Sequence, residues 1–300
     1  MKLIVRADDV GYTNVCNIGA FETMYNGVTT AADLMLDTPG TIDAMERLKE
    51  LPWISVGWHN HFWGSPVLDP SKVPTMYDTK TGHFRTNLRF AEDVSYDECL
   101  AEMRAQMDRC VKVLGHAPDT ILSFGGTTPF SRATDKIIKE YGIISGFAYS
   151  KPFFFQEAED RGYHAPERYA NRKIYMLQPG EATEKMVRTD LLEEHVTSYN
   201  PLVDLFSGVL FEEIPEDATV VFVLHPGCVD YYVCREGDSG PGSSHYLLVR
   251  PIDSHALCSA EIKTWIREKK FELCSFTDAL YGTQKYQNHL RAIDSDLCML

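Results

Sequence analysis

Two adjacent carboxylates, Asp8 and Asp9, stand at the end of the strand-like run Lys2–Ala7. Carboxylates that share a site repel each other, so a metal ion, a proton or abundant water must relieve the repulsion. A metal ion and a proton would give a hydrolase its metal ligand and general base, whereas water would mean only a solvated turn. Adjacent strand residues point to opposite faces, so both carboxylates can serve one site only if the backbone bends after Ala7. Val10-Gly11 permits that bend.

Two histidines separated by one residue, His59 and His61, lie in a second strand-like segment, Ile54–Phe62. Alternate side chains of a strand share a face, so both imidazoles could bind one cation, and Gly57 on that face leaves room beside it. The alternative is a half-buried pair in an aromatic-rich strand. With the carboxylate pair at another strand end, the pattern favours a catalytic divalent ion such as zinc.

A single histidine, His225, follows the apolar run Val220–Leu224 and precedes the sharp turn Pro226-Gly227. A histidine at this position can act as a general acid or base, because its pKa lies near the working pH. Taken alone, it could equally be a turn residue that bonds to the backbone.

The segments that must position these residues alternate between strand-like and helix-like patterns. This alternation predicts an α/β fold with mostly parallel strands, in which functional groups gather at the carboxyl ends of the strands. No repeat or linker divides the chain, so we expect one domain over residues 1–300. The predicted strands are Lys2–Ala7, Ala31–Leu36, Ile54–Phe62, Thr120–Phe124, Ile143–Ala148, Thr219–Leu224 and Glu272–Ser275, and the predicted helices are Asn14–Asn26, Thr41–Leu51, Ser95–Leu114, Ser131–Tyr141, Ser254–Glu268 and a terminal helix within Gln284–Leu300.

Two long segments, 64–93 and 235–249, show no regular pattern. The first is rich in Pro, Thr and Asp, and the second contains Gly-Asp-Ser-Gly-Pro-Gly-Ser-Ser. Long loops in compact domains are usually functional or disordered, and we expect both to face the substrate.

The net charge of −14 argues against nucleic acid and anionic membranes as partners and is compatible with a neutral sugar. The eight cysteines are scattered without a CxxC pattern, which is typical of reduced thiols in a cytoplasmic protein. No apolar run is long enough to cross a bilayer, and no signal region precedes the first strand. Association into a homo-oligomer stays open.

The sequence resembles the YdjC/ChbG-like carbohydrate deacetylases. The resemblance rests on Arg6-Ala-Asp-Asp-Val-Gly11, Gly57-Trp-His-Asn-His-Phe62, Gly64-Ser-Pro-Val67, His225-Pro-Gly-Cys-Val-Asp230 and the late Arg250…Asp253, which together span nearly the whole chain. It implies an irregular (β/α) TIM-like barrel that removes N-acetyl groups from amino sugars such as chitooligosaccharides.

The same resemblance implies roles for individual residues. Asp8 corresponds to the catalytic base, and Asp9 and His59 correspond to ligands of a divalent metal such as zinc or magnesium. His225 corresponds to the general acid or to a group that supports it. In addition, Trp63 could stack on a sugar ring.

We also expect two arginines, Arg6 and Arg250, at the substrate site. Either guanidinium could pair with Asp8 and hold that carboxylate ionised.

One departure from the family pattern concerns the third metal ligand. The family usually has a histidine-rich segment after the middle helix, but the matching stretch here, Pro118–Pro129, contains no histidine. His61 could complete the site, which we favour because strand geometry puts it on the ligand face. Alternatively, the more distant His116 or His164 supplies the third ligand, or the metal affinity is weak and the activity is altered or lost. An O-acetyl esterase and a catalytically degenerate sugar-binding protein are therefore the rival functions.

Overall fold

A curled parallel sheet forms the centre of the protein. The computed structural model describes residues 1–121, 126–144, 148–149, 174–177, 199–208, 211, 214–230 and 244–300. The strands of the sheet are β1 (Lys2–Val10), β2 (Ala31–Leu34), β3 (Ser55–Trp58), β6 (Thr120–Ile121), β7 (Ala148–Tyr149), β8 (Ile174–Leu177), β9 (Thr219–Leu224) and β10 (Glu272–Leu273). Their order is β6-β3-β2-β1-β9-β8-β7, and β10 pairs with the start of β1. All of these pairings are parallel, which confirms the predicted α/β barrel-like class.

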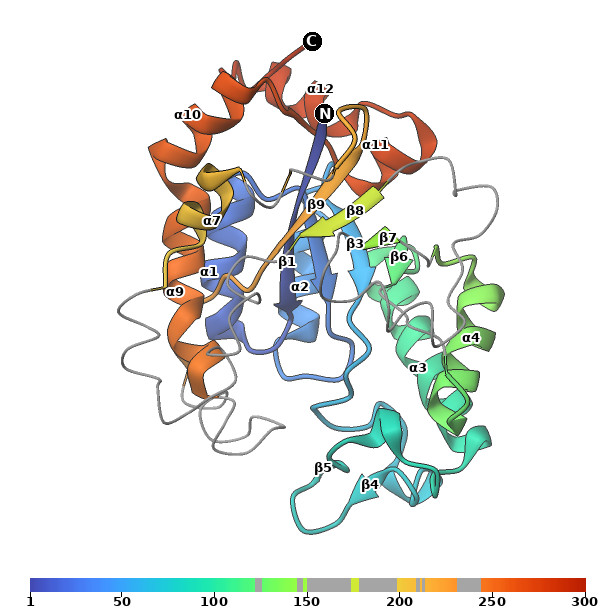
Figure 1. Cartoon of the computed structure of the whole chain (residues 1–300). Coiled ribbons are helices and arrows are strands. Elements are labelled where there is room, and N and C mark those ends of the chain that lie inside the picture. The colour runs from blue at the N-terminus through green and yellow to red at the C-terminus, as the bar shows by residue number, and fades with distance from the viewer. Residues whose placement is uncertain are drawn as a thin grey trace.

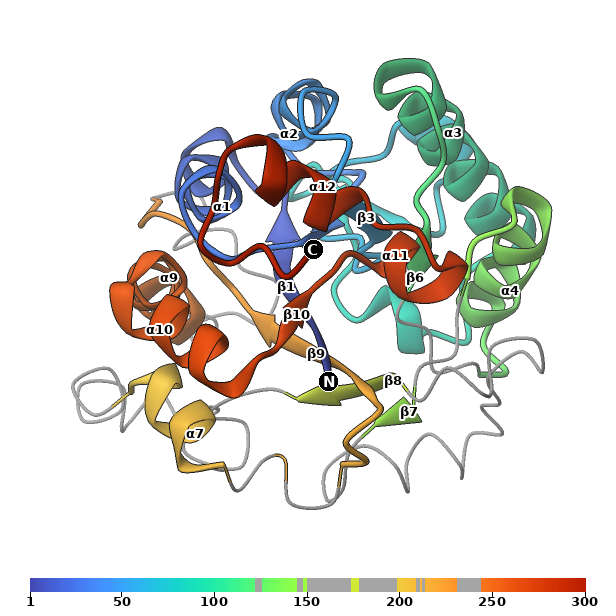
Figure 2. The ribbon, with the colours of Figure 1, turned by 90° about the horizontal axis from the view of Figure 1, so that it is seen from above.

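Helices surround the sheet on its outer side, as the view from above shows (Figure 2). Both termini lie at the amino-terminal end of β1, at the top of Figure 1. The described α-helices are α1 (Asn14–Tyr25), α2 (Thr41–Leu48), α3 (Tyr96–Leu114), α4 (Pro129–Tyr141), α7 (Pro201–Ser207), α9 (Ser244–Cys258), α10 (Ala260–Lys269), α11 (Phe276–Tyr281) and α12 (Lys285–Ala292). Most predicted elements are confirmed, with ends that differ by a few residues.

Helix caps explain several of these ends. The Thr13 side chain accepts a hydrogen bond from the backbone N–H of Cys16 at 3.0 Å and so begins α1. α3 and α4 each end at a glycine in the left-handed region, Gly115 (φ 98°) and Gly142 (φ 69°).

Side chains alternate between two apolar layers along the central strands. On β1, the odd-numbered residues from Leu3 to Ala7 pack in the large cluster beneath the helices, and Ile4 packs on the inner side of the curl. Strand β9 alternates in the same way, with Val221 and Val223 on the inner side. A strand that is buried on both faces needs an almost continuous apolar sequence, which both strands have.

Two predicted boundaries are wrong. The strand over Ile54–Phe62 ends at Trp58, because the backbone N–H of His61 bonds to the carbonyl of His59 and Phe62 turns into the left-handed region (φ 60°). The helix over Ser254–Glu268 is interrupted, because the Ser259 side chain accepts from the N–H of Ile262 and caps a new helix, α10.

The predicted loop over 235–249 is also partly wrong. Its residues 244–249 lie in α9, and the residues before them lie outside the described ranges. Within the described ranges, no helix combines the length and apolar character that a membrane span requires.

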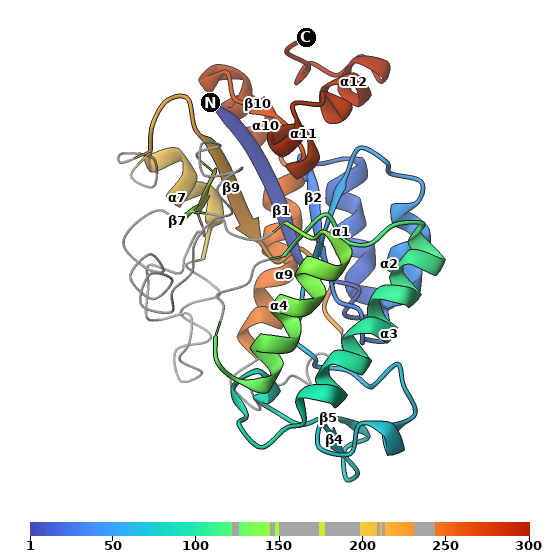
Figure 3. The same cartoon turned by 90° about the vertical axis from the view of Figure 1, so that its right-hand side faces the viewer.

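The long segment 64–93 leaves the carboxyl end of β3 and carries the hairpin β4 (Tyr77–Asp78) and β5 (His83–Phe84), at the bottom of Figure 3. Buried carboxylates fix its beginning. Glu102 on α3 accepts hydrogen bonds from the backbone N–H groups of Val67 (2.9 Å) and Leu68 (3.0 Å).

Asp37, which follows β2, holds the first two residues of the same segment, Gly64 and Ser65. Its carboxylate accepts from the backbone N–H of Gly64 at 2.6 Å, and its carbonyl accepts from Ser65 at 3.0 Å. A Cβ atom at Gly64 would lie 2.0 Å from that carbonyl oxygen, so only glycine fits. Burial raises the pKa of Asp37 to about 6 in spite of the Gly64 hydrogen bond.

The raised pKa of Asp37 predicts a pH-dependent cost in stability. A folded state that holds this proton more tightly than the unfolded chain loses stability as pH rises from 3.8 to about 6. Asp37→Asn keeps an acceptor for Gly64 and removes the buried charge. Its free energy of unfolding, measured by urea denaturation, should therefore exceed that of the wild type above pH 6 by up to about 3 kcal/mol.

The advantage of Asp37→Asn should shrink toward pH 4. Asp78→Asn makes the same chemical change in the hairpin, away from the Gly64 contact, and serves as the control. An advantage of Asp37→Asn that is the same at all pH values would contradict this explanation.

Candidate active site at the carboxyl ends of the strands

The alternation of the strands brings polar side chains to the inner side of the curl. Arg6 and Asp8 follow Ile4 at two-residue intervals on β1, and Asp33 follows Ala31 on β2. These side chains lie at the carboxyl ends of their strands, where barrel enzymes place their catalytic groups.

Asp8 and Asp9 reach the same site through a β-bulge. The pairing of β1 with β2 shifts by one residue between Ala7 and Val10, so β1 carries one extra residue there. Asp9 adopts a left-handed φ of 59°, which aspartate tolerates better than most residues. The bend that the sequence predicts after Ala7 is therefore present.

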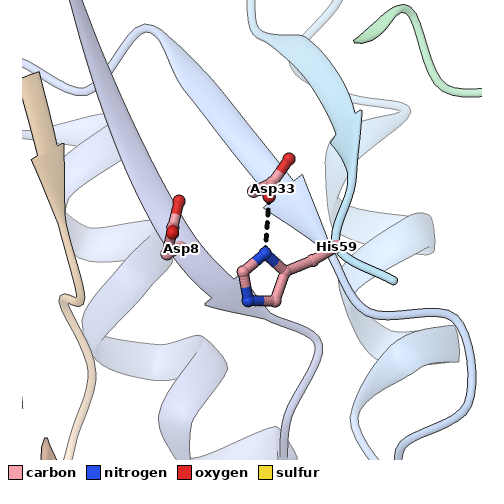
Figure 4. Close-up of side chains that lie close together, drawn as sticks. All are labelled: Asp8, Asp33 and His59. Atoms are coloured by element: carbon pink, nitrogen blue, oxygen red, sulfur yellow. Dashed lines mark hydrogen bonds and ion pairs between the residues drawn. The ribbon is translucent and has the colours of Figure 1, made fainter. Parts of the chain in front are cut away.

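His59 lies between two carboxylates. Its Nδ1 makes a hydrogen bond of 2.5 Å with Asp33 Oδ2, and its Nε2 lies 2.8 Å from Asp9 Oδ1 (Figure 4 draws the first contact). All three side chains are buried. Residues from three neighbouring strand ends therefore meet around one imidazole.

Two buried arginines balance the carboxylates. Arg6 Nε lies 2.6 Å from Asp8 Oδ1, and its second nitrogen pairs with Asp33. Arg250, from α9, places a guanidinium nitrogen 2.5 Å from Asp9 Oδ2. Of the two pairings predicted for Asp8, Arg6 makes it, and Arg250 holds the neighbouring carboxylate instead.

These contacts separate the pKa values of the site. Burial raises the pKa of Asp8 to about 6, against the opposing charge of Arg6. Burial also acts on Asp9 and Asp33, but their pKa values are lowered, because Arg250 lies against Asp9, Arg6 lies against Asp33 and His59 lies against both.

The pKa of His59 moves in the opposite direction. Burial disfavours its charged form, but the hydrogen bond and charge of Asp33, together with Asp9 and Asp8, raise the pKa to about 10. Three carboxylates therefore face two guanidiniums and one imidazolium, and a metal ion bound at His59 would displace one of the two imidazolium protons.

The donor atoms fit a divalent cation. One oxygen or nitrogen from each of Asp8, Asp33 and His59 lies within 4.8 Å of the others. Within the described residues, the buried atoms without a hydrogen-bond partner include Asp8 Oδ1, Asp9 Oδ1 and His61 Nδ1. Asp8 Oδ1 and Asp9 Oδ1 nevertheless lie in ion pairs with Arg6 and His59. Buried polar atoms are rarely left unsatisfied, so His61 Nδ1 points to a ligand at the site.

His61 lies beside His59, with 4.2 Å between the ring centroids. The strand face that we predicted for the two rings does not exist, because β3 has already ended. The turn described above brings the rings together instead. Burial and the nearby charge of His59 lower the pKa of His61 well below its usual value, so the ring is neutral, as a metal ligand must be. Its role as a ligand stays a prediction.

An aromatic surface continues from His61 at the edge of the site. Half-buried Trp63 lies 4.3 Å from the His61 ring and 5.5 Å from buried Tyr12, measured between centroids. The guanidinium of Arg250 lies 5.7 Å from the centre of the Tyr12 ring.

His225 follows β9 and lies across the site from His59. Its Nε2 is 3.9 Å from Asp8 Oδ2, and its side chain is 13% exposed. Burial, together with the cation Arg250, lowers its pKa to about 3 in spite of Asp9, so the ring is neutral. The backbone N–H of His225 donates to Asp253 Oδ2 at 2.8 Å.

Sequence comparisons identify the family of this chain. A family model described as YdjC-like protein matches residues 2–268. The chain belongs to the YdjC-like family.

Several relatives of this YdjC-like protein are similar over almost their full length. A protein named carbohydrate deacetylase from Brevibacillus brevis is 28% identical, with 93% of this chain and 99% of the relative covered. A protein named carbohydrate deacetylase from Enterococcus faecalis is 32% identical (92% and 97%), and one named chitooligosaccharide deacetylase from Proteus mirabilis is 31% identical (93% and 98%).

A solved structure supports the fold of the YdjC-like chain. It belongs to an Enterococcus faecalis protein assigned provisionally to cellobiose-phosphate cleavage, with a TM-score of 0.64 and 22% sequence identity. The match covers 92% of this chain and 98% of that one.

His116 and His164 are the other candidates for the third metal ligand, and the position of His116 argues against it. His116 is exposed, and its Nδ1 lies 2.7 Å from the carbonyl of Ala117. It precedes β6 and so lies at the amino ends of the strands, away from the site. His164 and residues 122–125 of the Pro118–Pro129 stretch lie outside the described residues.

Sequence reasoning missed Asp33 and gave no role to Asp253. Asp33 is a lone carboxylate in the apolar strand Ala31–Leu34. It lies two residues after Ala31, which faces the inner side of the sheet, so the alternation of the strand could have placed Asp33 on the inner side as well. Asp253 was noticed only within a motif. It anchors the His225 backbone and accepts a hydrogen bond from the Tyr199 hydroxyl at 2.8 Å.

The turn after His225 is held by close backbone contact. A Cβ atom at Gly19, in α1, would lie 2.4 Å from the carbonyl carbon of Gly227. We therefore expect Gly19→Ala to lower the free energy of unfolding by about 1–3 kcal/mol, measured by denaturant titration.

This expectation opposes helix propensity, which favours alanine over glycine by about 1 kcal/mol. Ile18→Ala changes an exposed neighbour on the same helix and is the control, with an expected effect below about 0.5 kcal/mol. A Gly19→Ala protein as stable as the wild type would show that the contact does not constrain the turn.

Proposed function

We propose that this YdjC-like protein is a cytoplasmic, metal-dependent hydrolase that removes N-acetyl groups from amino sugars or chitooligosaccharide-like carbohydrates. The observation that carries the proposal is the buried cluster at the strand ends, in which ligand atoms of Asp8, Asp33 and His59 lie within 4.8 Å of one another and Asp9 lies against His59. The names of the relatives, carbohydrate deacetylase and chitooligosaccharide deacetylase, support the substrate class. The seven described cysteines are all free, which supports a reducing compartment.

Asp9 and His59 would hold the metal ion, with His61 as the third protein ligand. A zinc or magnesium ion, when bound there, would polarise the acetamide carbonyl and lower the pKa of a bound water. Asp9 is already held ionised by Arg250, and His61 is already neutral, so both present their ligand forms.

Asp8 is the general base in this proposal. Its pKa of about 6 lies near neutral pH, where a carboxylate can accept a proton from water and release it again. The contact with Arg6 Nε orients the carboxylate, so Arg6 acts on the base rather than directly on the sugar.

His225 is the general acid. It begins the cycle neutral, so it must first receive a proton, and Asp8 Oδ2 at 3.9 Å is the nearby source. The proton taken from water thus passes through Asp8 and His225 to the departing amine, which needs it to leave. Asp253 holds the backbone of His225 in place during this transfer.

The accessible part of Trp63 is the proposed sugar platform, and buried Tyr12 packs against it. The apolar faces of pyranose rings stack on aromatic rings, and Trp63 is half-buried beside the metal-binding histidines. Arg250 lies beneath Tyr12 and is almost fully buried, so it supports the platform and Asp9 together.

Acetate release tests the proposal. The purified chain, loaded with zinc, should release acetate from N-acetylglucosamine oligomers, and Asp8→Asn should reduce kcat at least 100-fold while the bound zinc content stays unchanged. His59→Ala and His61→Ala should each strip the zinc.

The outcomes separate the rival functions. If the protein binds zinc but releases no acetate from any N-acetyl sugar, the proposal is refuted. Acetate release from O-acetyl sugars alone would identify an esterase. Sugar binding without zinc binding would identify a degenerate binding protein. Full zinc content in His61→Ala would remove that residue from the ligand set.

The platform makes a separate prediction. Trp63→Ala should raise KM for a chitooligosaccharide about 10-fold or more with little change in kcat, because stacking binds the ground state and the transition state alike. Trp53→Ala removes the same indole from a position stacked on His289, away from the site, and should leave KM unchanged. A fall in kcat alone would place Trp63 in the chemistry rather than in binding.

A further inference from the structure

We propose that Asp33 is a positioning residue that orients His59 as a metal ligand. The metal ion would then bind between Asp9 and His59 Nε2, and not within the compact group of Asp8, Asp33 and His59. This inference rests on the metal ion of the proposed function and adds a role that the family resemblance did not supply.

The two nitrogens of His59 have different surroundings. Nδ1 makes a true hydrogen bond with Asp33 Oδ2 at 2.5 Å. Nε2 lies 2.8 Å from Asp9 Oδ1, yet Asp9 Oδ1 has no hydrogen-bond partner among the described residues. Nε2 is thus the nitrogen that Asp33 leaves open, and a cation that takes the place of its proton would lie against both Nε2 and Asp9 Oδ1.

Asp33 has little remaining capacity to bind a metal itself. Its Oδ2 receives both His59 Nδ1 and the guanidinium of Arg6. Its Oδ1 lies directly over Gly57, where a Cβ atom would come within 2.0 Å. A metal ion on Asp33 Oδ2 would have to displace His59 or Arg6, whereas a metal ion at His59 Nε2 would leave both contacts of Asp33 in place.

This arrangement follows a general pattern of metal sites. A histidine ligand usually donates its second ring N–H to a carboxylate, which fixes the tautomer and the ring orientation. Asp33 is 2% exposed and sits on β2 beside β3, so it is rigid enough for that task. Its position also explains why β3 needs glycine at Gly57.

Zinc affinity and the nitrogen spectrum of His59 test the inference on the full chain. Calorimetric titration with Zn²⁺ alone should show a 10- to 100-fold loss of affinity in Asp33→Ala, with a smaller loss in Asp33→Asn because the amide oxygen can still accept from Nδ1. Nitrogen-15 NMR should show that the wild-type His59 carries its proton on Nδ1 when zinc is bound, and that Asp33→Ala loses this fixed tautomer. Asp9→Ala should abolish binding, and Asp8→Asn should leave affinity within about threefold.

Two results would overturn the inference. If Asp33→Ala and Asp33→Asn both abolish zinc binding as completely as Asp9→Ala, Asp33 is a ligand. If affinity and the His59 tautomer do not change in either variant, Asp33 has no positioning role. Should Asp33→Ala not fold, the NMR spectrum of Asp33→Asn decides, because a merely structural aspartate would not alter the His59 tautomer.

These measurements need no deacetylase activity. A zinc site with the predicted dependence on Asp33 but without acetate release would refute the proposed function and leave the inference standing.

Discussion

Three buried carboxylates can share one site only because cations lie against each of them. Arg6 contacts both Asp8 and Asp33, and Arg250 contacts Asp9. An uncompensated buried charge costs several kcal/mol, so the loss of either guanidinium would leave a carboxylate that the fold cannot hold ionised. The different partners also set different pKa values, so that one carboxylate can exchange protons while its neighbour stays charged.

The geometry of the site comes from two simple features of the strands. Two-residue alternation carries Arg6, Asp8 and Asp33 to the inner side of the curl at the level of the strand ends. One extra residue in β1 then adds Asp9, which regular alternation would have sent to the opposite face. Four of the charged side chains of the site are therefore placed by ordinary parallel strands and a single bulge.

The sequence predicts much of this arrangement, because strand ends and their polar residues are local features. The fold class, the positions of Asp8, His59 and His225 at strand ends, and the bend at Asp9 all follow from apolar runs and their interruptions. The end of β3 does not, because the backbone bond from His61 to His59 and the left-handed conformation of Phe62 leave no trace in the alternation of side chains. Asp33 was missed for a different reason, since its partners lie on other strands and only the assembled sheet brings them together.

The pairing of Asp9 with Arg250 joins residues 241 positions apart in the chain. The acidic half of the site, from β1 to the turn after β3, is synthesised long before α9 emerges from the ribosome. Until α9 docks, Asp9 lacks its guanidinium, and burying it would be unfavourable. The acidic strand ends must therefore remain hydrated until α9 has been synthesised. The charge balance of the active site is completed only then, late in translation.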